Sequence, residues 1–388
     1  MYEQEYRILF ALISPLLGGK ADPCVAKGLS FDEKTAKTLC VLAKRHSISN
    51  LLYLAVRGRE DFPLPLQAAL EKELFSTAHR ALLQEHESAR VTAALTEKGI
   101  PFLLMKGAVI RPLYPSPEMR VSCDVDIFYD KKHRRAVDRL MADFGYTLHE
   151  SDPNHDEYLH TSGIILEMHR NFLTDFPTVD RYYEDVWERL IPVDGCAYRM
   201  SDEDFYIYQT VHTMKHFATA GTGIRSVMDT FVYLSAKPAL DRAYLERELS
   251  ALRLWEFHLT LERLAAAWFD GEPMDEALTE ISDYILGSGT YGIAMQRAVN
   301  DTAAVRGGKL GYLFFRAFPP YHWMAEKHPT LRRAPILLPF FWAWRLISVP
   351  FKNRGVVGNT VRAVRTADAS ESERLAQVMK RVGLYRYR

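Results

Sequence analysis

The sequence predicts an α+β protein in which a small β-sheet core is embedded in a mainly helical chain. Apolar residues recur at helical spacing up to residue 99 and again from residue 201 onward. Between these regions, short apolar runs separated by Gly, Pro, Ser and Asp are typical of strands. The chain has 388 residues, of which 48% are hydrophobic and 25% charged, so it can bury a sizeable core.

The first 99 residues are predicted to form a helical cap. An amphipathic helix is expected near the amino terminus, where acidic residues precede the apolar run and no basic leader of an export signal is present. Further helices are expected over residues 30–44, 47–57 and 66–98, with Gly99 ending the last of them.

Strands and helices then alternate in the predicted core. Strands are expected over residues 101–105, 125–129 and 146–149, helices over 108–114 and 131–144, and hairpin strands over 157–160 and 163–169. Pro115, Ser116 and Pro117 require a loop between the first helix and the second strand.

Two carboxylates stand at the head of the second strand. Residues two apart in a strand project from one face, so Asp124 and Asp126 point together while Val125 points toward a core. Two carboxylates held this close repel each other unless a cation lies between them, and magnesium prefers such oxygen ligands. An isolated Asp-x-Asp also fits a turn or an exposed strand end.

A third acid lies in an otherwise apolar strand. Glu167 and His169 share the face opposite Leu166 and Met168. A third carboxylate usually helps to bind the metal that activates the attacking hydroxyl in two-metal nucleotidyl transfer. His169 is either a companion of Glu167 or a strand histidine bonded to a neighbouring carbonyl. His149, His155 and His160 have no ligand-like spacing.

These motifs resemble a known family. They are Lys106-Gly107, Leu113-Tyr114-Pro115, Arg120, Asp124-x-Asp126 and Glu167-x-His169. Together they resemble the signature of an uncharacterised nucleotidyltransferase family within the DNA polymerase β-like superfamily. The resemblance implies a small mixed sheet, a Gly-rich turn that holds a triphosphate, and an acidic metal site. The superfamily usually has Gly-Ser or Gly-Gly at the turn, where this chain has Lys106-Gly107; the lysine could supply positive charge instead.

The resemblance implies a magnesium-dependent nucleotidyltransferase that moves an NMP from an NTP to a hydroxyl and releases pyrophosphate. Asp124, Asp126 and Glu167 are the expected catalytic residues and the ligands of Mg²⁺, or alternatively of Mn²⁺. Lys106 and Gly107 are expected to contact the nucleotide phosphates. Arg120 is expected either to contact phosphate or to hold Asp124 through a salt bridge.

The region after residue 200 is predicted to be helical. Helices are expected over residues 202–218, 224–234, 241–254, 255–269, 275–286, 291–305 and 371–382. Lys215, between His212 and His216 on the first of these helices, is a candidate nucleotide contact or a surface residue. Arg225 and Asp229 have the i, i+4 spacing of a structural ion pair.

Residues 311–351 are unusually rich in aromatic residues and proline. A transmembrane helix is not expected, because Pro339 and Arg345 interrupt a run that is barely long enough. Burial within the helical region is favoured, and peripheral membrane contact by residues 334–351 is the alternative. Four scattered cysteines without a Cys-x-x-Cys pair favour a reducing, cytoplasmic location over a disulfide framework or zinc site.

Charge limits the partners that can be expected. There are 49 basic and 49 acidic residues, so no global field favours nucleic acid. The expected partners are an NTP donor and an acceptor that is a small molecule or a macromolecule. The alternatives are a catalytically weak nucleotide-binding scaffold and a toxin-like transferase acting on protein or tRNA. The predicted domains are a cap (1–99), the catalytic core (100–200) and a carboxy-terminal helical domain (201–388).

Overall fold

The computed structural model describes residues 3–20, 31–172, 176–290 and 369–384, and parts of the segment 314–352. The chain divides into two compact units. The first comprises Met1–Thr213 and Ile224–Ser282, and the second comprises Met214–Gly223 and Asp283–Arg388. All the strands lie in the first unit, which therefore contains the predicted catalytic core.

The described residues of the first unit form one seven-stranded sheet. Its strands are β1 (Phe102–Leu104), β2 (Asp124–Tyr129), β3 (Tyr146–Ser151), β4 (His155–His160), β5 (Ile165–His169), β6 (Ile191–Asp194) and β7 (Ala197–Arg199). They follow the order β3-β4-β5-β2-β1-β7-β6. The β2–β5 and β1–β7 pairs are parallel and the others antiparallel, so the predicted α+β class with a mixed sheet is confirmed.

Helices make up most of the rest of the first unit. The α-helices that lie wholly within it are α1 (Glu3–Ile13), α3 (Glu33–Arg45), α4 (Ser49–Val56), α5 (Leu64–Glu97), α6 (Gly107–Ile110), α7 (Arg134–Asp143), α8 (Pro177–Tyr182), α10 (Ile224–Ala236), α11 (Arg242–Ala251) and α12 (Trp255–Phe269). Short 3₁₀ turns are η1 (Ser14–Leu17), η2 (Arg111–Leu113), η3 (Pro117–Met119), η4 (Lys131–His133) and η5 (Val186–Arg189). Two longer helices, α9 (Asp202–Thr219) and α13 (Glu276–Ser288), contribute residues to both units.

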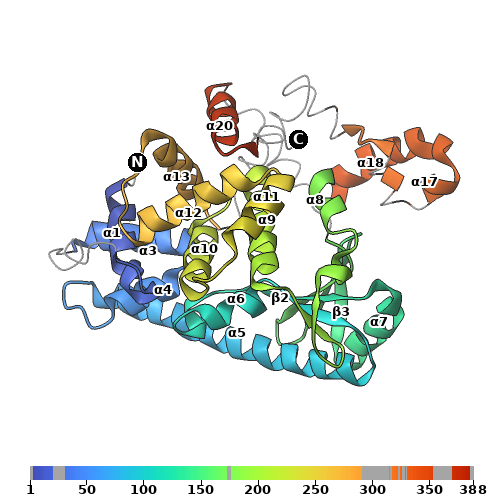
Figure 1. The fold of residues 1–388 in the computed structure, drawn as a ribbon, viewed down its shortest axis with the longest axis horizontal. Helices are drawn as coiled ribbons and strands as arrows, with labels where there is room; N and C mark the ends of the chain where they lie inside the picture. Colours follow the sequence, from blue (N-terminus) through green and yellow to red (C-terminus); the bar gives the residue numbers. More distant parts are fainter. Residues whose placement is uncertain are drawn as a thin grey trace. The chain divides into compact units, whose positions relative to one another are not determined.

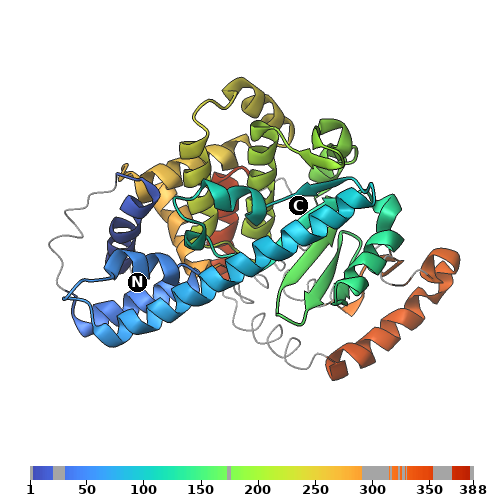
Figure 2. The same ribbon diagram turned by 90° about the horizontal axis from the view of Figure 1, so that it is seen from below.

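One face of the sheet is covered by α5 and α7, which run along it in Figures 1 and 2. The apolar side chains that meet there include Val91 and Leu95 of α5, Leu140 and Met141 of α7, and Ile127, Leu166 and Met168 of the strands. Burial of these side chains fixes which face of β2 and β5 points into the core. The residues that alternate with them must therefore project from the opposite face.

Most elements predicted before residue 100 are present. The helix expected over residues 30–44 is α3, and the side chain of Asp32 caps it by accepting from the backbone N–H of Thr35 at 2.6 Å. The long helix expected over residues 66–98 is α5, which begins two residues earlier and has proline in its first turn. Both predictions are confirmed. Helix caps and helical periodicity depend only on residues close in sequence, so they can be recognised without knowing the tertiary structure.

The helix expected over residues 108–114 is wrong in length. The α-helical part, α6, ends at Ile110, and η2 follows it. Pro112 explains the change, because proline has no backbone N–H to continue the ladder of hydrogen bonds. A helix of one turn carries little dipole, so the amino end of α6 attracts anions only weakly.

The hairpin expected before residue 170 is confirmed as β4 and β5, although β4 begins two residues earlier than predicted. The hairpin of β6 and β7 was not predicted. Its strands are short, all four residues of β6 are exposed, and Pro192 lies within it. The predicted boundaries near residues 99 and 200 fall between α5 and β1 and between β7 and α9. The three-domain division stays a prediction.

The second unit contains α17 (Thr330–Arg333), η6 (Pro335–Leu337), α18 (Leu338–Lys352) and α20 (Ala369–Arg381). The expected burial of the aromatic segment is wrong for three side chains, since Ile336 is 88%, Phe340 75% and Trp344 61% exposed. Among the described helices, none is long and apolar enough to cross a membrane. The helix expected over residues 291–305 lies outside the described residues.

Candidate metal and nucleotide site

The register of β2 against β5 brings the three predicted acids together. Asp126 is the direct parallel partner of Glu167, and Asp124 lies beside Ile165. Because side chains alternate along a strand, Asp124, Asp126 and Glu167 project from the same face, opposite the core covered by α5 and α7. The structure therefore assembles the acids from two neighbouring strands.

Asp126 is the most deeply buried of the three, with 2% of its surface exposed. Its Oδ1 atom accepts from Lys106 Nζ at 2.5 Å and lies 2.8 Å from His169 Nε2. Burial alone would raise the pKa of Asp126, but the charge of Lys106 and the bond to His169 hold this pKa well below its usual range. Asp126 is thus a stable carboxylate in the folded protein.

Asp124 has a different environment. Its side chain is half-buried, and within the described part of the chain no hydrogen bond or ion pair holds its carboxylate. Burial and the nearby negative charge of Asp126 raise the pKa of Asp124 to about 6. A cation bound beside Asp124 would oppose both effects, which is the behaviour expected of a metal ligand.

Lys106 lies at the centre of the acidic group. Its Nζ atom is 2.5 Å from Asp126 and 3.6 Å from Glu167. Burial would lower the pKa of Lys106, but the carboxylates of Asp126, Glu167 and Asp124 outweigh it and raise the pKa well above its ordinary value. The Lys106 ammonium therefore supplies a positive charge where a bound cation would also be stabilised.

The backbone of Lys106 is strained. Its φ of 44° and ψ of −114° belong to a region that glycine adopts readily and other residues rarely do. Such a conformation costs about 1–3 kcal/mol and persists only when the surrounding structure requires it. Lysine thus occupies a glycine-like backbone position, and its side chain reaches the acids from there.

Gly107 is required by close packing. A Cβ atom there would lie 2.4 Å from Ser122 Oγ and 3.0 Å from Arg120 Nη1. No side chain fits without movement of these groups, so glycine lets the turn after β1 approach the loop before β2. The predicted contact of Gly107 with phosphate stays a prediction.

Arg120 makes a different salt bridge from the one expected. Its Nε and Nη2 atoms donate to the two oxygens of Asp229 on α10 at 2.9 and 2.8 Å, and Nη1 donates to Ser122 at 2.6 Å. Tyr114 also donates to Asp229, at 2.5 Å. Arg120 is buried in this network, so it anchors the loop before β2 to α10 and does not pair with Asp124.

Arg225 was expected to pair with Asp229, whose oxygens accept from Arg120 and Tyr114. The Arg225 guanidinium donates to the carbonyl of Val121 at 2.9 Å. Its charge also acts on Asp124, whose pKa it lowers against the larger opposing effects. Arg225 therefore lies near the acidic group and is a candidate phosphate contact that the sequence did not indicate.

Two further residues belong to the site. His155 on β4 is the antiparallel partner of His169, and the two rings stack with centroids 4.9 Å apart. Tyr208 of α9 is buried close enough for the acids to act on it: burial, together with Asp126 and Glu167, raises the Tyr208 pKa although Lys106 opposes the change. His155 has no ligand-like spacing in the sequence, but the hairpin brings it beside His169.

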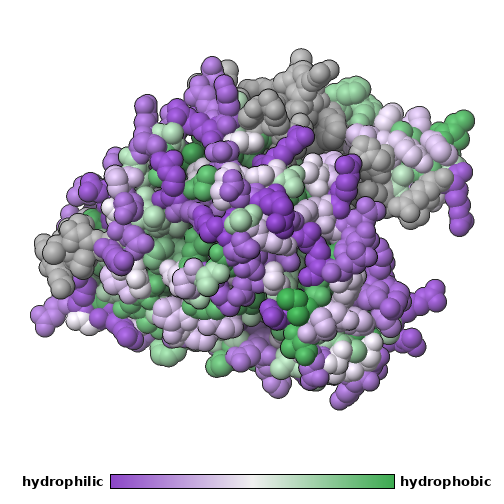
Figure 3. Space-filling view, viewed as in Figure 1, coloured by the Kyte–Doolittle hydropathy of each residue, from purple (hydrophilic) through white to green (hydrophobic). Residues whose placement is uncertain are grey.

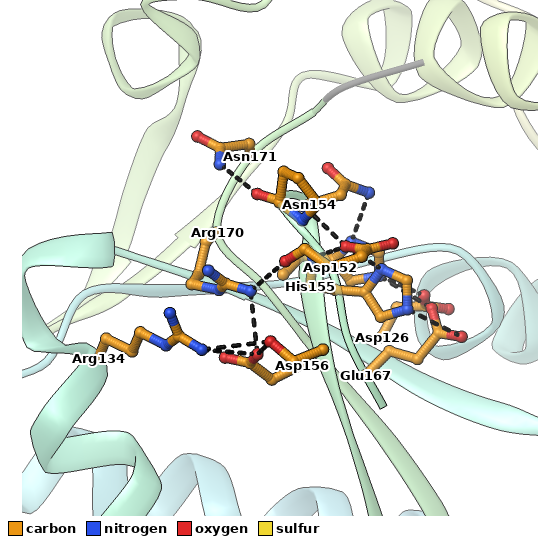
Figure 4. Close-up of polar contacts among 12 residues, drawn as sticks. Asp126, Arg134, Asp152, Asn154, His155, Asp156, Glu167, Arg170 and Asn171 are labelled. Carbon is orange, nitrogen blue, oxygen red and sulfur yellow. Dashed lines mark hydrogen bonds and ion pairs between the residues drawn. The ribbon is translucent and has the colours of Figure 1, made fainter. Parts of the chain in front are cut away.

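Lys215 lies on the part of α9 that belongs to the second unit, whereas Tyr208 lies on the part in the first unit. Its proposed contact with nucleotide therefore stays a prediction. Figure 4 shows that His155, Glu167 and Asp126 converge on one side of β4, while Arg134 and Arg170 bind Asp156 on the other. Oxygen and nitrogen donors suitable for a divalent ion are thus gathered on the acidic face.

The site is thus a mixed sheet that carries three carboxylates on one face, with the Lys106 ammonium beside them. Comparison with known families identifies the protein further. Residues 32–270 match the model of a family described as uncharacterised nucleotidyltransferase, and the chain belongs to this family. The match covers the whole sheet and the acidic site, and the predicted resemblance is confirmed. No curated protein and no solved structure matches the chain.

Proposed function

We propose that this protein is a divalent-metal-dependent nucleotidyltransferase that moves an NMP from an NTP to a hydroxyl of an acceptor. The observation that carries the proposal is the direct pairing of Asp126 with Glu167, with Asp124 on the same face. Family membership independently supports nucleotidyl transfer. Magnesium is the proposed ion, with Mn²⁺ as the alternative, because three carboxylates offer the hard oxygen ligands that these ions prefer.

The residues fit such an ion. The pKa of Asp124 is raised and, among the described residues, no ion pair holds its carboxylate, whereas Asp126 is already paired with the Lys106 ammonium. In the proposal Asp124, Asp126 and Glu167 hold the metal. When bound, the metal would neutralise charge on the triphosphate and favour the reactive form of the acceptor hydroxyl.

The reaction itself needs few groups from the chain. Glu167 is placed to help remove the proton from the acceptor hydroxyl, whose oxygen attacks the α-phosphorus in line. The bond from the α-phosphorus to the bridging oxygen breaks, and pyrophosphate leaves. Lys106 moves from Asp126 to a phosphate oxygen as the nucleotide binds, and Arg225 is the second candidate cation near Asp124. Positioning and charge neutralisation supply most of the rate enhancement.

Calorimetric titration with each of the four NTPs, with and without Mg²⁺, tests the proposal. Wild type is compared with Asp126→Asn and with Asp143→Asn, an exposed position at the end of α7. Metal-dependent binding should weaken at least about tenfold in Asp126→Asn and remain unchanged in Asp143→Asn. Equal, metal-independent behaviour of all three proteins would contradict the proposal.

The second candidate is a nucleotide-binding scaffold with little chemistry. The ion pair of Lys106 with Asp126 favours it, because the lysine already neutralises an acid that an active site would offer to metal. Pyrophosphate release in the presence of a broad set of hydroxyl acceptors distinguishes the candidates. Tight, metal-dependent NTP binding without pyrophosphate from any acceptor would favour the scaffold.

A toxin-like transferase acting on protein or tRNA is the remaining alternative for the acceptor. On the face drawn in Figure 3 hydrophilic and hydrophobic residues are intermixed. With equal numbers of acidic and basic residues, the chain has no net charge to attract RNA. A cytoplasmic location is proposed from the four scattered cysteines, which include no Cys-x-x-Cys pair. Peripheral membrane contact through residues 334–351 is proposed from their exposed aromatic side chains.

A further inference from the structure

Two histidines and a glutamate converge beside the carboxylates assigned to the nucleotide metal. His155 and His169 are direct cross-strand partners, and Glu167 lies two residues from His169 on the same face. One ligand atom from each of His155, Glu167 and His169 lies within 4.8 Å of the other two. Figure 4 shows His155 and Glu167 turned toward the same point. The strand pairing places these three residues as neighbours on one face of the sheet.

The separations already approach those around a bound ion. His169 Nε2 lies 3.1 Å from Glu167 Oε2, and His155 Nε2 lies 3.9 Å from Glu167 Oε1. Ligand bonds of about 2.1 Å place neighbouring donor atoms roughly 3.0–3.4 Å apart in octahedral or tetrahedral geometry. His155 Nε2 would have to move closer to Glu167 Oε1 to reach that spacing.

Polar groups stand behind both imidazoles. Asp152 Oδ1 lies 3.4 Å from His155 Nδ1, and Asn154 Nδ2 lies 3.4 Å from His169 Nδ1. The Asp152 carboxylate is itself held by the backbone N–H groups of Asn154 and His155, each at 2.7 Å. Metal-binding histidines usually place the second ring nitrogen against such a carboxylate or amide, which fixes the ring orientation.

His155 lacks the bonds of an ordinary structural histidine. Among the described residues its buried Nδ1 atom has no hydrogen-bond partner, and its Nε2 atom is too far from Glu167 for a hydrogen bond. The ring is held by stacking on His169 and by the sheet. The Nδ1 atom of His155 thus has only the 3.4 Å contact with Asp152, and within the described part of the chain no hydrogen bond holds its Nε2 atom.

We propose that His155, Glu167 and His169 form a binding site for a divalent transition-metal ion, next to the magnesium held by Asp124 and Asp126 and sharing Glu167 with it. Two imidazoles and one carboxylate suit Zn²⁺, Fe²⁺ or Co²⁺, whereas magnesium prefers oxygen ligands alone. Binding of the transition metal at this site does not depend on whether the protein catalyses nucleotidyl transfer. Only the role of this ion in catalysis, as the ion nearest the acceptor hydroxyl, rests on the proposed function.

The test uses the full chain without nucleotide, titrated with Co²⁺ and followed by visible absorption, with Zn²⁺ and then millimolar Mg²⁺ as competitors. His155→Phe removes the ligand nitrogen and keeps an aromatic ring to stack on His169. His149→Phe, at an exposed position on the adjacent strand β3, is the matched control. Far-ultraviolet circular dichroism confirms that each variant is folded.

Wild type and His149→Phe should bind one Co²⁺ with a spectrum of nitrogen and oxygen ligands, displaced by Zn²⁺ and not by Mg²⁺. His155→Phe should bind it at least tenfold more weakly, and Asp152→Asn about 10–100-fold more weakly. Equal affinity of His155→Phe and His149→Phe, displacement by Mg²⁺, or a thiolate charge-transfer band would overturn the proposal.

Failure of this site and failure of the proposed function give different results. If Co²⁺ binds through His155 but NTP binding does not depend on Asp126, the transition-metal site stands and nucleotidyl transfer does not. If NTP binding requires Asp126 and Mg²⁺ but His155→Phe leaves the Co²⁺ affinity unchanged, the proposed function stands and this site does not.

Discussion

Lys106 is the residue whose structure differs most from what its type suggests. It adopts a glycine-like backbone conformation, and its ammonium lies 2.5 Å from Asp126. A strained residue kept at the centre of a site is a common feature of functional turns. Its two properties, strain and charge, can be separated by substitution.

Lys106→Ala should be less stable than Lys106→Gly by about 1 kcal/mol or more. Both variants leave Asp126 without its ammonium partner, but only glycine relieves the backbone strain. Urea unfolding of the two variants at one pH measures the difference. Equal stability would show that the turn is not strained in solution.

His258 on α12 provides a second test at the residue scale. It is fully buried, and burial lowers the pKa of His258 to about 4. The unfolded chain, with a pKa of about 6.5, then binds a proton that the folded chain does not between these values. Stability contributed by neutral His258 is therefore present above pH 6.5 and is lost as the pH falls toward 4.

Between pH 7 and pH 5 this residue should reduce the free energy of unfolding by about 2 kcal/mol. His258→Leu should remove that part of the pH dependence. His79→Leu, at an exposed position on α5, should retain the wild-type dependence. Urea unfolding at pH 7 and pH 5 measures this difference in the free energy of unfolding. A difference in His258→Leu equal to that of the wild type would show that His258 is not its source.

At the scale of elements, the turn after β1 is packed against the loop before β2. Gly107 and Ser122 are in contact, and Arg120 ties this loop to Asp229 on α10. Breaking a buried ion pair of this kind typically costs 3–5 kcal/mol. The acids of β2 thus depend on a network that extends from the turn to a helix.

Gly107→Ala should destabilise the protein by about 1–3 kcal/mol, because the new Cβ atom would overlap Ser122 Oγ. Ser122→Ala removes that oxygen and leaves Ser122 Cβ at an ordinary 3.4 Å. The double variant should therefore recover part of the loss caused by Gly107→Ala. Thermal unfolding of the four proteins of this cycle measures the coupling, and strict additivity would contradict the contact.

In the second unit, α17 and α18 offer a matched pair of apolar residues. Leu331 is fully buried and Phe340 is 75% exposed. Leu331→Ala should cost about 2–5 kcal/mol, whereas Phe340→Ala should change stability by less than about 0.5 kcal/mol. Calorimetric unfolding compares them. A similar loss in both variants would mean that Phe340 is covered in solution.

At the scale of the whole molecule, local sequence patterns predicted the individual helices and strands better than they predicted which strands pair in the sheet. Period-2 alternation correctly placed Asp124 with Asp126, and Glu167 with His169, on shared strand faces. The pairing of β2 with β5, which makes Asp126 and Glu167 adjacent, depends on sheet order that no local pattern encodes. The same applies to Arg120 and Asp229, which are distant in sequence and meet only in the folded chain.

His155 is a site residue that the sequence did not indicate. Sequence spacing among histidines gave no indication of a ligand, yet extending the predicted hairpin by two residues pairs His155 with His169. Lys106 could be located from the motif but its backbone conformation could not, because φ there is set by tertiary contacts. The sequence therefore indicated the three acids, Lys106 and His169, but not the position of His155.

The parallel pairing of β2 and β5 also has a consequence during synthesis. The chain must complete α7, β3 and β4 before Glu167 can join Asp126. At roughly 5–20 residues per second, a ribosome needs several seconds to add these roughly 40 residues. During that interval each nascent chain carries Asp124 and Asp126 on β2 without β5, the parallel strand that supplies Glu167. Every new molecule thus acquires its complete set of acids only once β5 has been translated.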